Sequence, residues 1–64
     1  MLNVEGEGMT SIEVYNTIGQ RVMMQQVDGN KAQVNTESLD NGLYVVRIYA
    51  NDGSMLNRTF SVAR

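Results

Sequence analysis

The chain has 64 residues, a formal net charge of -2 and no cysteine, histidine or proline. A chain of this length forms one small domain with a limited core. Its acidic balance argues against nucleic acid as a partner, because phosphate binding needs a basic surface. Without cysteine and histidine, the usual catalytic nucleophile–base pairs and the usual zinc and iron–sulfur ligands are also missing.

The remaining charged residues do not form a recognisable catalytic or metal-binding pattern. Lys31 is the single lysine and lies in a polar stretch beside a turn. The acidic turns at 28–30, 40–42 and 51–53 lack the alternating ligands and the distal glutamate of a calcium loop. We therefore expect no catalytic residue, no metal and no cofactor. The first residues lack the basic and apolar segments of a signal peptide.

Apolar residues that alternate with polar ones predict short strands in the first half of the chain. These strands cover residues 2–5, 11–15, 21–27 and 31–35, and glycine, asparagine or aspartate separates them. With Gly19 in the left-handed region, a three-residue loop joins the second strand to the third. This register sets Val14 opposite Val22, and it sets Tyr15 opposite Arg21 in a cation–π contact.

The polar segment 35–42 is too long for a tight hairpin and predicts a crossover between two sheets, pinned by Leu39. Residues 43–50 follow, between turns formed by Gly42 and Gly53, and they are apolar on both faces. Such a strand is central in its sheet or covered on its second face.

The last strand, 54–64, pairs with the strand 43–50 through a three-residue loop. This register sets Ile48 opposite Leu56 and Tyr44 opposite Phe60. It also leaves Arg58 on the core face, which indicates an edge position or a snorkelling side chain. The elements together predict an all-β fold, a small antiparallel Greek-key β-sandwich (Ig-like) of about six to seven strands.

Three segments resemble the C-terminal sorting domains of the type IX (Por) secretion system, over residues 10–64. Residues 11–22 resemble the family pattern I-x-V-Y-N-x-x-G-x-x-V, and residues 34–48 resemble I-D-x-S-x-L-x-x-G-x-Y-x-V-x-I. Residues 58–64 are similar to the final basic-then-apolar strand. The opening Y-P-N-P strand of the family is absent, so residues 1–64 are expected to be one sorting domain without the first strand.

The resemblance implies a sorting signal rather than an enzyme, although the cargo itself can be an enzyme such as a peptidase. The partners implied are the outer-membrane translocon or a shuttle protein, a sortase that cleaves upstream of Met1, and the cargo domain. The implied route passes through the periplasm to the outer membrane and cell surface, or to secretion. The open edge left by the absent strand also predicts a homodimer or strand exchange.

Within this interpretation, the last strand and the strand before it carry recognition. The last strand adds to a partner's sheet, while alternate side chains give specificity. The expected recognition residues are Gly42, Tyr44, Val46, Ile48, Arg58, Phe60, Val62 and Arg64. An alternative is an adhesive or carbohydrate-binding fibronectin-like β-sandwich, for which Tyr15, Tyr44 and Tyr49 would form an exposed cluster.

Overall fold

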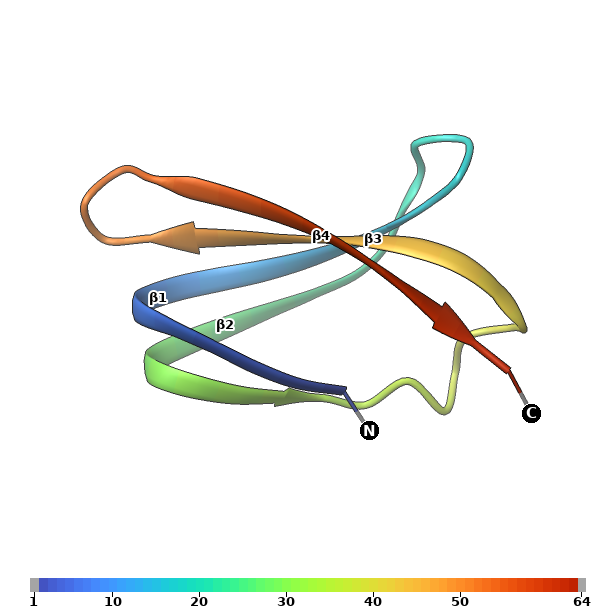
Figure 1. Ribbon diagram of the computed structural model, residues 1–64, viewed down its shortest axis with the longest axis horizontal. Helices are drawn as coiled ribbons and strands as arrows, with labels where there is room; N and C mark the ends of the chain where they lie inside the picture. Colours follow the sequence, from blue (N-terminus) through green and yellow to red (C-terminus); the bar gives the residue numbers. More distant parts are fainter. Residues whose placement is uncertain (1, 64) are drawn as a thin grey trace.

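The computed structural model describes residues 2–63, which form one antiparallel β-sheet of four strands (Figure 1). The strand order is β2-β1-β3-β4, so the connection from β2 to β3 crosses over β1. The all-β class and the antiparallel pairing are confirmed, whereas the crossover lies within one sheet and not between two sheets as predicted. Within the described part of the chain, no helix has the length and apolar character needed to cross a membrane. The strands are β1 (Leu2–Asn16), β2 (Arg21–Val34), β3 (Gly42–Ala50) and β4 (Met55–Val62).

The predicted six to seven strands of a Greek-key sandwich are not confirmed, because two predicted turns are bends inside continuous strands. β1 continues through residues 6–8, and β2 continues through residues 28–30 beside it. Gly8 has a φ of 60° and Gly29 a φ of 132°, and the β1–β2 register shifts between Glu5 and Met9. Such a bulge bends and twists a strand pair without ending it. The long hairpin therefore folds back at its glycines (Figure 1).

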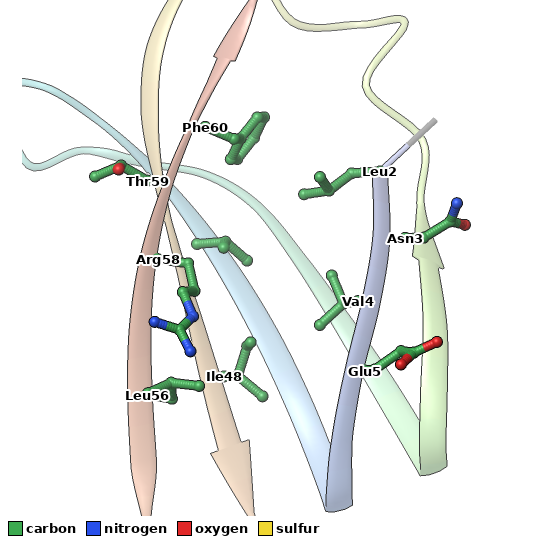
Figure 2. Close-up of a pocket in the computed structure, with 10 residues that line it drawn as sticks. Leu2, Asn3, Val4, Glu5, Ile48, Leu56, Arg58, Thr59 and Phe60 are labelled. Carbon is green, nitrogen blue, oxygen red and sulfur yellow. The ribbon is translucent and has the colours of Figure 1, made fainter.

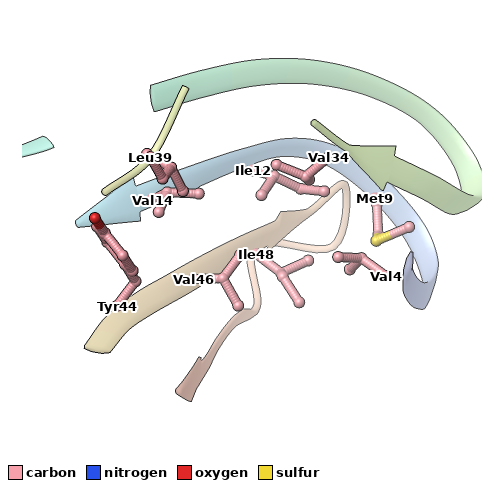
Figure 3. Packing of buried hydrophobic residues seen from close by; sticks show 9 residues of the cluster. All are labelled: Val4, Met9, Ile12, Val14, Val34, Leu39, Tyr44, Val46 and Ile48. Carbon is pink, nitrogen blue, oxygen red and sulfur yellow. The ribbon is translucent and has the colours of Figure 1, made fainter. Parts of the chain in front are cut away.

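This fold-back creates the core. It brings Val4 and Val34 into one cluster with the inner faces of β1 and β3 (Figure 3). Leu39, from the crossover, is buried in the same cluster, as the sequence predicts. The cluster consists of Val4, Met9, Ile12, Val14, Val34, Leu39, Tyr44, Val46 and Ile48.

The hairpin between β1 and β2 keeps the predicted loop but not the predicted register. The N–H of Gly19 donates to the carbonyl of Asn16 at 3.1 Å, and Gly19 has a φ of 88°. Tyr15 lies opposite Arg21, as predicted. The next pair is Val14 with Met23, so the predicted Val14–Val22 pair is wrong. A register shift between Val14 and Tyr15 leaves Val22 exposed and turns Met23 toward the core.

The hairpin between β3 and β4 has the predicted register. Ile48 pairs with Leu56, and Tyr44 pairs with Phe60. The N–H of Ala50 donates to the carbonyl of Ser54 at 3.0 Å, and Gly53 has a φ of 88° in the loop. β3 lies between β1 and β4, so its predicted central position is confirmed.

Candidate functional site

A groove of about 200 Å³ lies between the first residues of β1 and the strand β4. Leu2 and Val4 point into it from one wall, and Leu56 and Phe60 line the other (Figure 2). Ile48 of β3 lies at its base. The groove exists because β1 bends at its glycines and carries Leu2 and Val4 over to face β4.

β4 is an edge strand, and its backbone offers hydrogen-bonding groups on one side. It pairs with β3 and with no other strand among residues 2–63. In an antiparallel ladder, hydrogen-bonded and non-hydrogen-bonded pairs alternate. The N–H of Ala50 donates to the carbonyl of Ser54, so these two residues form a hydrogen-bonded pair. Starting one residue after this pair, every second residue of β4 points its N–H and C=O groups away from β3. These residues are Met55, Asn57, Thr59 and Ser61.

The alternate residues of β4, which include Leu56, Arg58 and Phe60, direct their side chains to the core face of the sheet. Arg58 lies opposite Val46, in the register that the sequence predicts. Its guanidinium group extends into the groove rather than into the core (Figure 2). An edge strand therefore accommodates this charge, because the groove beside it is open.

The structure divides the predicted recognition residues between the interior and the groove. Tyr44 is buried away from the groove, whereas Val46 and Ile48 are buried residues of β3 that line the groove. The Tyr44 ring stacks on Phe60 with 5.6 Å between centroids, and its hydroxyl donates to the carbonyl of Asp40 at 2.7 Å. Arg58 and Phe60 line the groove. Gly42 begins β3 with a φ of 156°, Val62 is half-buried at the end of β4, and Arg64 lies outside the described residues.

Sequence reasoning missed the opposite wall of the groove. Leu2 and Val4 form this wall, and Leu56 lies beside Phe60 on the β4 wall; Leu2, Val4 and Leu56 were not predicted as site residues. The alternation of Leu2 and Val4 was a usable signal, since it marks one face of a strand. What the alternation could not give was the bend that carries this face toward β4.

The outer face of the sheet holds a chain of polar contacts that crosses from β2 to β4. Glu13 accepts a hydrogen bond from the Tyr15 hydroxyl at 2.8 Å and forms an ion pair with Arg21 at 2.9 Å. Arg47, rather than the predicted Arg21, lies over the Tyr15 ring, 5.0 Å from its centroid. The Nε of Arg47 also donates to Asn57 at 3.2 Å. These cross-strand contacts tie the four strands together on the face opposite the core.

This network shifts the pKa values of Glu13 and Tyr15. The hydrogen bond from Tyr15, followed by that from Arg21, lowers the pKa of Glu13 below its ordinary value of 4.5. The same bond to Glu13 raises the pKa of Tyr15 above its ordinary value of 10.0. Glu13 therefore stays ionised in the folded protein at pH values where it takes up a proton in the unfolded chain.

We expect the network to make the protein sensitive to acid. A lowered pKa in the folded state gives stability that is present above pH 4.5 and is lost as the pH falls through the folded-state value. The melting temperature should therefore decline below about pH 4.5, and Glu13→Gln should decline less over the same range. Thermal unfolding between pH 2 and pH 7, followed by circular dichroism, measures this.

A matched control for Glu13→Gln is Glu7→Gln, which removes the same charge from an exposed side chain. Glu7→Gln should keep the acid dependence of the unchanged protein. If both substitutions reduce the acid-induced decline of the melting temperature equally, the net charge of the protein, and not the Tyr15–Glu13–Arg21 contacts, sets the pH response.

The tyrosines do not gather on one exposed surface. Tyr44 is buried on the core face, whereas Tyr15 and Tyr49 are half-buried on the outer face, both beside Arg47. Among residues 2–63, no group of three or more histidine, cysteine, aspartate or glutamate side chains is placed to hold a metal ion. The groove and the edge of β4 lie next to each other and form the candidate recognition surface.

Comparison with known families supports a role in secretion. The family model described as the secretion system C-terminal sorting domain matches residues 1–61. Searches of curated proteins and of solved structures found no significant match. The matched family consists of type IX sorting signals, which direct proteins to the cell surface or outside the cell, and it is not an enzyme family. The chain therefore belongs to the C-terminal sorting domains of the type IX secretion system.

Proposed function

We propose that this domain is the address by which a cargo protein is recognised at the type IX outer-membrane translocon, and that β4 is the recognition strand. A shuttle protein or the translocon engages the folded domain in the periplasm. A sortase then cleaves upstream of Met1, and the cargo is attached to the cell surface or released. The observation that carries this proposal is the edge position of β4 in a domain of the sorting family.

An edge strand supports recognition for a physical reason. Its unpaired N–H and C=O groups can form a ladder with a strand of a partner, and the backbone bonds supply affinity. In β4, these groups belong to Met55, Asn57, Thr59 and Ser61. The side chains at the intervening positions face the groove, so both parts of such a contact lie on one strand.

The test places residues 1–64 at the C-terminus of a periplasmic reporter, in a host that has the type IX system. Removing residues 55–64 should reduce the surface-exposed reporter to the background of a reporter without the domain. Equal surface display after this deletion would contradict the proposal. Protease accessibility on intact cells measures surface display.

A point substitution separates recognition from folding. In Thr59→Pro, the lost N–H faces the free edge, so the β3–β4 ladder stays intact while a partner strand loses a donor. Thr59→Ala keeps this N–H and is the matched control. We expect Thr59→Pro to fold, by circular dichroism, and to lose surface display, whereas Thr59→Ala retains it. Should Thr59→Pro fail to fold, Ser61→Pro near the end of β4 removes an N–H of the same orientation.

A further inference from the structure

Arg58 is a charge placed among apolar side chains without a partner to compensate it. Within residues 2–63 the structure shows no hydrogen bond, ion pair or ring contact for its guanidinium group. Its neighbours along the same face of β4 are Leu56 and Phe60, and Leu2 and Val4 lie across the groove (Figure 2). Glu5 also borders the groove, but its side chain points to the other side of β1 (Figure 2).

The spacing of these side chains defines what fits against them. Leu56, Arg58 and Phe60 follow one another at every second position, as side chains on one face of a strand do. An extended partner segment has the same period, so its matching positions are apolar, acidic and apolar. Arginine and a carboxylate form strong hydrogen bonds with a specific, often bidentate geometry. The groove also has room for an apolar side chain, since apolar cavities of about 150 Å³ hold benzene.

We propose that the groove binds an extended segment of another protein with the pattern apolar–x–acidic–x–apolar, whose carboxylate pairs with Arg58. This inference rests on the proposed function, because it specifies the partner of β4. The segment lies along β4, and its apolar side chains cover Leu56 and Phe60 and meet Leu2 and Val4.

The sequence argues against a second copy of this chain as the occupant. When two β4 strands pair with each other, Arg58 faces either Arg58 of the other copy or an apolar residue. None of the seven acidic residues of the chain has an apolar residue at both the second position before it and the second position after it. Residues 1–64 therefore do not supply the complementary pattern, which argues against a second copy of this domain as the occupant.

The binding test uses the 64-residue protein and a labelled synthetic peptide with the sequence KTVTETVTK, which carries the pattern once. Fluorescence anisotropy should show saturable binding. A peptide with lysine in place of the glutamate should bind about tenfold more weakly, as expected for the loss of a charge-assisted contact. In heteronuclear NMR spectra, the glutamate peptide should shift signals of β4 and of residues 2–5.

Substitutions then assign the contact to Arg58. Arg58→Glu should reverse the preference, so that it binds the lysine peptide more tightly than the glutamate peptide. Arg58→Gln should lose the discrimination, whereas Lys31→Gln removes an equal charge from β2 and should retain it. Because binding is compared between two peptides on one folded protein, a general loss of stability cannot imitate the reversal.

Several results would overturn the inference. They are equal affinity for both peptides, no binding of either peptide, or a concentration-dependent dimer in light scattering with shifts confined to β4. The last result would identify a second copy as the occupant. The export assay keeps the two proposals apart. If Thr59→Pro abolishes surface display while Arg58→Glu exports normally and binds no peptide, β4 is the recognition strand but the acidic partner is wrong.

Discussion

Replacing Ile12 with alanine is expected to unfold most of the protein at room temperature. Ile12 is 1% exposed on β1, the strand that pairs with both β2 and β3. Truncating a buried isoleucine to alanine costs about 2 to 5 kcal/mol, because the transfer free energy is lost and a cavity remains. A single core of this size rarely supplies more than about 3 to 5 kcal/mol in total. Urea unfolding followed by circular dichroism measures the change.

The chain provides a matched control for this substitution. Ile18→Ala removes the same atoms from the loop between β1 and β2, where Ile18 is 76% exposed. It should change the free energy of unfolding by less than about 0.5 kcal/mol. Ile12→Val, which removes one methylene, should fall between them at about 0.5 to 1.5 kcal/mol. Similar effects for Ile12→Ala and Ile18→Ala would contradict the described core.

The hairpin between β3 and β4 was predictable because its constraints are local. A register that places Arg47 opposite Arg58 brings like charges together, whereas the three-residue loop places Ile48 against Leu56. Gly53 then fits the left-handed position of that loop. Apolar pattern, charge and turn chemistry select the same register, so sequence alone was sufficient.

The bends of β1 and β2 could not be predicted, because the same residues also form turns. The glycines at positions 6 and 8 permit either a chain reversal or a bulge in a continuing strand, and both of these conformations use positive φ values. The choice depends on contacts between distant residues. The carbonyl of Gly8 accepts a hydrogen bond from the N–H of Asn51 at 2.8 Å. The N–H of Gly8 donates to Oδ1 of Asn30 at 3.1 Å.

The candidate site was predictable only in part for the same reason. Arg58 and Phe60 were found because the register of the last hairpin places them on the core face. Tyr44 and Ile48 were grouped with them by sequence pattern; Ile48 does line the groove, but Tyr44 is buried away from it and supports the sheet from inside. The wall formed by Leu2 and Val4 depends on the bend of β1, so the groove itself could not be found without the structure.

Gly8→Ala, at the bend of β1, is expected to weaken the fold more than Gly53→Ala does. Gly8 has a φ of 60°, and a non-glycine residue in this region costs about 1 to 3 kcal/mol. An added Cβ would also lie 2.7 Å from Oδ1 of Asn51, so that this side chain has to move. Gly53→Ala is the matched control, because Gly53 has a φ of 88° and no atom within 4 Å of an added Cβ.

Comparing Gly8→Ala with Gly53→Ala separates two costs in the free energy of unfolding: that of the positive φ and that of the close approach of Asn51 to the added Cβ. In urea unfolding, Gly53→Ala should show the conformational cost alone, and Gly8→Ala should show a larger loss. Adding Asn51→Ala to Gly8→Ala should recover part of the difference, since the backbone bond from Asn51 remains while its side chain is removed. Equal losses for Gly8→Ala and Gly53→Ala, with no recovery, would show that Asn51 does not confine the bend. The bend also positions Leu2 and Val4 opposite β4, so Gly8→Ala should weaken peptide binding in the groove even where the protein remains folded.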